Sequence, residues 1–214
     1  MTAGTGRAGD EERALPLAEL QHRVRNTLAT TRIIARRSAE LSDNLEDYAA
    51  HLDGRLAALA RVQNVILHNV AAGIDLNRLV TDELLSVLAY QDGRTRVEGP
   101  EVQLHLRAAE PVALVLHELA TNAIKFGALN TSSGRLNVSW RIEEGEHEPC
   151  LVFDWIERGV CLDAHEPHRR GFGTEMLTEM LAYTLQAQAS LVFDPEGVHY
   201  CMVLPLTERV LHRA

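Results

Sequence analysis

Hydrophobic and small residues in the first third of the chain recur every three or four positions, which is the spacing of one face of an α-helix. Between about Arg13 and Leu41 these positions are Leu17, Leu20, Val24, Leu28, Thr31, Ile34 or Ala35, and Ser38. Up to about Asn69 the spacing is repeated by Leu45, Ala49, Leu52, Leu56, Leu59, Gln63 and Ile66. Ser42-Asp43-Asn44 separates the two stretches and can cap the second helix. The pattern predicts two long antiparallel helices joined by a short turn, a hairpin with little core of its own.

Beyond Gly73 the pattern changes between helical and extended spacing. The predicted helices are one over 74–89, one that opens at Glu110-Pro111 and leads to Asn122, and one over about 171–186. The predicted strands are two short segments within 94–106, longer ones over 135–143 and 151–157, and a closing hairpin over 189–193 and 199–204. Because there is no strict strand–helix–strand repeat, we expect an α+β sandwich rather than a Rossmann-like sheet.

Length and composition limit the classes of protein that this chain can be. Its 214 residues suit one medium domain or two small ones, and the net charge of −9 argues against general nucleic-acid binding. The three cysteines form no C-x-x-C pair and suit reduced thiols, and no apolar run approaches the roughly 18 residues of a membrane helix. We therefore expect a cytoplasmic protein with a disordered leader over 1–12, the hairpin over 13–72 and a second domain over 73–214.

The first predicted helix carries His22 almost opposite its apolar face, with Asn26 about one turn further along. An exposed imidazole with a pKa near 6.5 is a competent nucleophile near neutral pH, and the arginines crowding this helix could stabilise an arriving phosphoryl group. A solvated surface histidine on a basic helix face explains the same pattern. Both interpretations stay open on position alone.

The helix that leads to Asn122 places Glu118, Asn122 and Lys125 at i, i+4 and i+7, on one stripe. An amide oxygen suits Mg²⁺, a lysine suits phosphate oxygens, and a carboxylate can orient water or a proton. The stripe therefore suits a nucleotide with its metal. An ordinary solvated helix face is the equally good alternative.

A glycine turn and a tryptophan strand end follow this helix in the sequence. Arg169-Arg170-Gly171-Phe172-Gly173-Thr174 precedes a predicted helix, where backbone N–H groups can approach phosphate closely. Trp155-Ile156-Glu157 ends a predicted strand and could line a base pocket. A plain loop-to-helix turn and simple core packing of Trp155 explain these two segments equally well.

Taken in order, these segments resemble the HWE-type bacterial sensor histidine kinases over roughly residues 17–206. The His22-Arg23-Val24-x-Asn26 segment is similar to their phosphoacceptor box, and His117 to Lys125 is similar to their N-box with its characteristic histidine. Trp155-Ile156-Glu157 matches their W-x-E signature, and Gly171-Phe172-Gly173 matches their short glycine box. Each block is modest alone, and the ordered set is specific.

The resemblance implies a two-helix hairpin, a four-helix bundle if dimeric, followed by a Bergerat (GHKL-type) α/β sandwich that binds ATP. It implies that His22 accepts the γ-phosphoryl group, with Arg23, Asn26 and Glu118 as further catalytic residues, that Glu118 and Lys125 serve the phosphates, and that Asn122 holds Mg²⁺. The nucleotide-binding residues that it implies are His117, Asn122, Lys125, Phe126, Asp154, Trp155, Glu157, Arg170, Gly171, Phe172, Gly173 and Thr174. The phosphoryl group would then pass to an aspartate of a response-regulator receiver in a two-component system.

This chain departs from the wider kinase pattern in three places. Arg23 stands where many histidine kinases have an acidic base, so the general base is unassigned. The D-x-G-x-G adenine motif is absent, which leaves Asp154 and Glu157 as alternatives for the adenine amine. The Gly-Gly-Pro after W-x-E is reduced to Gly159-Val160-Cys161, so the lid is expected to differ.

Two functions remain in competition at this point. An autokinase is favoured over an ATP-independent phosphotransfer or scaffold protein, because such scaffolds tend to lose the N-box asparagine and the glycine turn. A homodimer through the hairpin is the expected assembly, with a monomer as the alternative. No sensor module precedes the hairpin in this sequence, so we expect either a separate sensor protein or a longer parent chain. Asn26 is also placed where a residue that orients water for dephosphorylation of a partner would sit.

Overall fold

The computed structural model describes residues 21, 24–25, 27–40, 42–68, 73–87, 93–145, 148–160, 176–208 and 210–211. These residues fall into two compact units, one within 1–56 and one within 57–214. The sequence places the boundary near residue 72 instead. The difference arises because the second half of the long helix α2, Leu45–His68, belongs to the second unit, where Val62 is part of the hydrophobic core.

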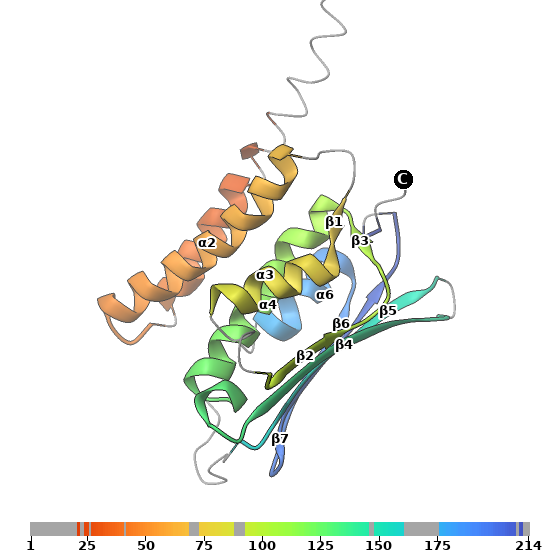
Figure 1. Ribbon diagram of the computed structural model, residues 1–214. Coiled ribbons are helices and arrows are strands. Elements are labelled where there is room, and N and C mark those ends of the chain that lie inside the picture. The colour runs from red at the N-terminus through yellow and green to blue at the C-terminus, as the bar shows by residue number, and fades with distance from the viewer. Residues whose placement is uncertain are drawn as a thin grey trace, which may run out of the picture. The chain divides into compact units, whose positions relative to one another are not determined.

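The first unit contains the turn of the predicted helical hairpin and the first half of its second helix. Residues 27–40 are helical, and the helix α2 follows them (Figure 1). α2 begins where the Asn44 side chain accepts a hydrogen bond from the Asp47 backbone N–H (2.9 Å), as the sequence predicts. Ser38 is fully buried and accepts a hydrogen bond from the buried Arg55 guanidinium (2.6 Å). This contact between residues 17 positions apart requires the two helices to run antiparallel across the short turn.

The second unit is built on a five-stranded sheet in the order β2-β4-β5-β7-β6. Its strands are β2 (Thr95–Glu98), β4 (Arg135–Glu143), β5 (Cys150–Arg158), β6 (Gln188–Asp194) and β7 (Gly197–Pro205). β2 runs parallel to β4, and the other neighbours are antiparallel. Two further short strands, β1 (Ile74–Asp75) and β3 (Gln103–Leu104), pair separately. The sheet is mixed, as expected for an α+β sandwich.

Helices cover one face of this sheet (Figure 1). They are α3 (Leu76–Ser86), α4 (Leu106–Lys125), the 3-10 turn η1 (Ala128–Asn130), the π-helical turn η2 (Met176–Met180) and α6 (Leu181–Leu185). Alternate strand residues face the helices, among them Phe153, Trp155 and Tyr200, whose side chains are almost completely buried. The structure thus confirms a two-layer α/β sandwich in the second unit.

Helix α4 begins five residues before the predicted start at Pro111. His105 caps it by accepting a hydrogen bond from the Arg107 N–H (3.2 Å), and Pro111 lies inside the helix. A proline there removes one backbone hydrogen bond and is disfavoured by local preference. Tertiary packing outweighs this loss, because α4 is the central core helix, with both Ala108 and Val112 buried.

By length and composition, α4 with its following turn, Leu106–Asn130, is apolar enough to span a membrane (mean hydropathy 1.3). This corrects the sequence-based expectation that no apolar run approaches that length. In the structure 61% of the most apolar 18-residue window of this segment is buried inside the protein, as for a core helix.

Candidate nucleotide and phosphotransfer site

The C-terminal half of α4 presents the polar stripe predicted from the sequence. Glu118 is buried, Asn122 is partly buried and Lys125 is the exposed last residue of the helix. The three side chains span about 60° of the helix circumference at 100° per residue. Among the residues that the structure describes, none forms a hydrogen bond with the Asn122 side chain, so its carboxamide oxygen can take a ligand. Phe126 follows the stripe and is 73% exposed.

His117 points away from this stripe. It lies five residues before Asn122, which places it about 140° away around the helix. Its Nδ1 is 2.7 Å from Oε1 of Glu83 on α3, and the other oxygen of Glu83 pairs with Arg61 of α2. The structure therefore does not bring His117 together with Asn122, although the resemblance groups both as nucleotide-binding residues.

The W-x-E segment at the end of β5 holds the backbone that follows α4. Glu157 is 4% exposed, and one carboxylate oxygen accepts a hydrogen bond from Trp155 Nε1 (2.9 Å). The other oxygen accepts one from the Ala128 N–H (2.7 Å), at the first residue of η1. Burial raises the pKa of Glu157, and these two hydrogen bonds offset part of the rise. Trp155 and Glu157 thus fix the turn that leaves the predicted N-box.

Gly127 completes this arrangement. A Cβ atom at Gly127 would overlap the Glu157 carboxylate and would lie 2.7 Å from Cα of Ala123. The backbone N–H of Gly127 donates to the carbonyl oxygens of Asn122 (3.0 Å) and Ala123 (3.1 Å), which ends α4. The close approach of strand and helix end therefore needs a residue without a side chain at this position.

Asp154 lies on the opposite face of the sheet from Glu157, because side chains alternate along β5. Its two oxygens contact His199 Nε2 (2.8 Å) and Arg141 Nη1 (2.7 Å). Burial alone would raise the pKa of Asp154, but the hydrogen bonds and charges of His199 and Arg141 lower it below its ordinary value. Of the two acids left open for adenine, only Glu157 lies on the face that α4 covers.

The remaining predicted site residues are outside the described part of the chain. They are His22, Arg23, Asn26, Arg170, Gly171, Phe172, Gly173 and Thr174. Their roles stay predictions from the sequence. The turn η2, which follows the glycine segment, is described: the buried Tyr200 hydroxyl donates to the Leu177 carbonyl oxygen (2.9 Å) and joins η2 to β7.

Sequence reasoning missed Glu83 and Arg61. Glu83 had a signal, since it stands in the apolar stripe of α3 beside Leu79, Val80 and Leu84. A carboxylate at a core position is rarely tolerated without a charged partner, so a search for such a partner would have been justified. Arg61 carried no signal, because an arginine on an amphipathic helix is ordinary.

The donor set of α4 fits a nucleotide with Mg²⁺ better than a metal site made of protein ligands alone. A carboxamide oxygen and a nearby carboxylate are hard ligands of the kind that Mg²⁺ uses together with phosphate oxygens and water. Within the described residues, no group of three His, Cys, Asp or Glu side chains could hold a metal ion by itself. The phosphates would therefore have to complete the coordination.

The family model and the curated relatives that this chain matches are all described as histidine kinases. Residues 19–101 match the family model described as HWE histidine kinase. The chain is 29% identical over 201 residues to the blue-light-activated histidine kinase of Brucella anthropi, covering 94% of this chain and 41% of that protein. The protein of the same name from Brucella ovis is 29% identical over 202 residues, with the same coverage. The chain spans about two fifths of the length of these curated relatives.

Solved structures show the same fold. The blue-light activated histidine kinase of Erythrobacter litoralis EL346 is similar with a TM-score of 0.56 and 20% identity, covering 98% of this chain and 66% of that chain. A structure of its histidine kinase domain is similar with a TM-score of 0.54 and 18% identity, covering 90% and 92%. The likeness supports a helical region followed by the α/β domain seen here.

Proposed function

We propose that this chain is an HWE-type histidine kinase, an ATP-dependent autokinase that phosphorylates its own His22, because residues 19–101 match the HWE histidine kinase model and the chain is 29% identical to a blue-light-activated histidine kinase. An imidazole nitrogen of His22 attacks the γ-phosphorus of ATP, the bond to the bridging oxygen breaks, and ADP leaves. The phosphoryl group then passes to an aspartate of a response-regulator receiver. This is the signalling chemistry of a two-component system.

The polar stripe on α4 is the observation that carries this proposal. Asn122 would hold Mg²⁺, Lys125 would contact phosphate oxygens, and Glu118 would orient a water or proton. Mg²⁺, when bound, neutralises charge on the phosphates. The residue that contacts the adenine amine is left unassigned, since Asp154 is held by Arg141 and His199 on the other face of the sheet. Both oxygens of the buried Glu157 already accept hydrogen bonds, from Trp155 and Ala128. Arg170 to Thr174 would line the lid.

Partners and assembly form part of the same proposal. Val24, Leu28 and Leu45 are 49%, 63% and 79% exposed on the hairpin, which supports a homodimer that buries them in a four-helix bundle. A monomer is the alternative outcome. We also propose a cytoplasmic location and a separate sensor protein as the source of the input signal.

The test is incubation of the full chain with γ-labelled ATP and Mg²⁺. Wild type is expected to take up acid-labile, alkali-stable label, and His22→Gln and Asn122→Ala are expected to abolish it. Two matched controls should label normally: His51→Gln, a second histidine of the hairpin, and Asn130→Ala, an exposed asparagine just beyond α4.

The possible results separate the competing functions. Label that survives His22→Gln would move the acceptor elsewhere. A wild-type protein that binds no nucleotide, but accepts a phosphoryl group from a phosphorylated receiver, would instead be the ATP-independent phosphotransfer protein. Transfer of label from the wild type to a purified receiver domain tests the second step.

A further inference from the structure

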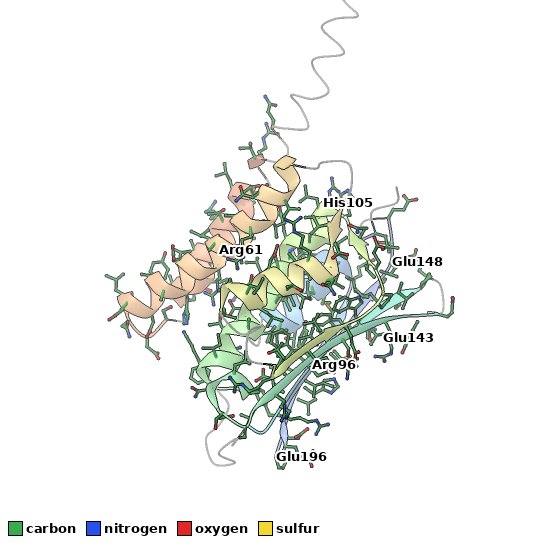
Figure 2. The ribbon with its side chains drawn as sticks, viewed as in Figure 1. Arg61, Arg96, His105, Glu143, Glu148 and Glu196 are labelled. Atoms are coloured by element: carbon green, nitrogen blue, oxygen red, sulfur yellow. The ribbon has the colours of Figure 1, made fainter. Side chains whose placement is uncertain are left out.

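One buried carboxylate joins three helices of the second unit. Glu83 of α3 contacts His117 of α4 through Oε1, 2.7 Å from Nδ1, and pairs with Arg61 of α2 through Oε2. Arg61, labelled in Figure 2, extends from the half of α2 that lies in this unit. The side chains of Glu83, His117 and Arg61 are 4%, 13% and 33% exposed. The cluster is therefore a largely buried set of charged and polar contacts rather than a surface ion pair.

The charges in this cluster determine which groups donate hydrogen bonds and which group accepts them. Burial by itself would raise the pKa of Glu83, but hydrogen bonds and charges from His117 and Arg61 lower it below its ordinary value. An ionised carboxylate only accepts hydrogen bonds, so Nδ1 of His117 carries a hydrogen and donates a hydrogen bond to Glu83. The guanidinium of Arg61 donates to the remaining oxygen. Every member of the cluster is thus directed toward Glu83.

The cluster acts on α4 from the side away from the proposed nucleotide. His117 and Asn122 lie about 140° apart around the helix and about 7.5 Å apart along it. Anchoring His117 to α3 and α2 opposes rotation of α4 about its axis. A rotation would displace Asn122 directly, because Asn122 is carried by the same rigid helix.

We propose that Glu83 and Arg61 are positioning residues, which through His117 fix the rotation of α4 and so set where Asn122 meets the metal of bound Mg²⁺·ATP. This inference rests on the proposed function. It gives His117 a role in the nucleotide site without contact with the nucleotide. It also makes the second half of α2 part of the support for that site.

A purely structural role makes a different prediction. An ion pair that only stabilises the fold would, when lost, lower stability and weaken all nucleotide binding together. A pair that positions Asn122 affects the part of the affinity that depends on Mg²⁺. Affinity measured with Mg²⁺ and with EDTA therefore distinguishes the two roles.

The experiment uses the full chain and a fluorescent ATP analogue, titrated with Mg²⁺ and again with EDTA. Glu83→Gln removes the negative charge and replaces one acceptor oxygen by an N–H₂ group that faces either Arg61 or Nδ1 of His117. It is expected to raise Kd in Mg²⁺ by about three- to thirtyfold. Kd in EDTA should change less than about twofold, on the same coupling argument. Asp82→Asn is the matched control, since it removes the neighbouring charge of α3, whose pair with Arg78 is exposed (3.5 Å).

Arg61 provides the second variant pair in case Glu83→Gln folds poorly. Arg61 is on the rim of the cluster, so Arg61→Met keeps the aliphatic packing and loses the charge. It should show the same Mg²⁺-specific loss, and Arg61→Lys should recover part of it. Urea unfolding of each variant separates weaker binding from weaker folding.

The outcomes are distinct. Equal losses of affinity in Mg²⁺ and EDTA, or no loss in either, would overturn the positioning role while leaving the autokinase proposal standing. A wild-type protein that binds the nucleotide under neither condition would overturn the proposed function and this inference with it. Only a Mg²⁺-specific loss absent from Asp82→Asn supports the inference.

Discussion

Substitution of Gly127 by alanine tests how the predicted N-box is held against the sheet. Gly127 has φ −105° and ψ −156°, which alanine can adopt, so backbone strain contributes nothing to the expected effect. The added methyl group would overlap the Glu157 carboxylate and press on Cα of Ala123 at 2.7 Å. Since the backbone of Ala123 cannot yield easily, the Glu157 side chain must leave its place.

The loss of folding stability can be estimated from the contacts that Glu157 loses when its side chain moves. Its hydrogen bond from the Ala128 N–H involves a charged or strongly polar acceptor, and such a bond contributes about 1.5–3 kcal/mol. Overpacking a closed site adds about 1–3 kcal/mol. Alanine also lowers the conformational entropy of the unfolded chain, which offsets about 0.4–1 kcal/mol of this destabilisation. We therefore expect Gly127→Ala to lower the free energy of unfolding by about 2–5 kcal/mol.

Urea unfolding followed by tryptophan fluorescence measures this change, because Trp155 is buried in the same cluster. The matched control is Asn130→Ala in the same turn, an exposed position where the substitution removes only a long hydrogen bond (3.3 Å) to the Lys125 carbonyl oxygen. It should change the free energy of unfolding by less than about 0.5 kcal/mol. The fluorescent nucleotide titration described above should show weaker binding for Gly127→Ala only.

A double-mutant cycle gives the refuting result. Glu157→Ala removes the group that the new methyl would meet, so Gly127→Ala should cost at least about 1 kcal/mol less in that background. Additive costs would show that the methyl group does not act through Glu157. A free energy of unfolding equal to that of wild type would show that the helix end and β5 are not in close contact at all.

Two further predictions concern the two faces of the sheet where β5 pairs with β7. Tyr200→Phe removes the buried hydroxyl that donates to Leu177, so urea unfolding should show a loss of about 1–2 kcal/mol; a midpoint equal to that of wild type would contradict this. Because His199 and Arg141 lower the pKa of Asp154 in the folded state, Asp154 contributes stability above its unfolded pKa of about 3.9 and loses it as the pH falls through the lowered folded pKa. Asp154→Asn should therefore give a flatter acid side in unfolding measured from pH 7 to pH 2, and an unchanged slope would refute the assignment.

Local pattern was sufficient for several elements. Period-two alternation located β4 at 135–143 and the closing hairpin of β6 and β7 within a residue or two, because one face of each strand is less exposed than the other. Three- and four-residue spacing located α2 in the same way. The start of α4 was wrong, since Pro111 is a local signal for a helix start that core packing overrides.

The candidate site was predicted as a set of residues and only partly as an arrangement. Spacing on one helix was enough to group Glu118, Asn122 and Lys125, because helical geometry fixes their relative directions. Asp154 and Glu157 could not be separated by function, since alternation shows that they face opposite ways but does not show which face α4 covers. The described residues supply that answer through the hydrogen bond from Ala128 to Glu157.

The sequence by itself determined the order of the elements, the amphipathic hairpin and the kinase-like series of motifs, since these depend on contacts between residues near one another in the chain. Tertiary structure alone decided the parallel pairing of β2 with β4 and the meeting of Arg61, Glu83 and His117 on three helices. These contacts join residues more than 20 positions apart, whose proximity depends on how the helices pack on the sheet. That packing is a property of the whole core, and no local pattern encodes it.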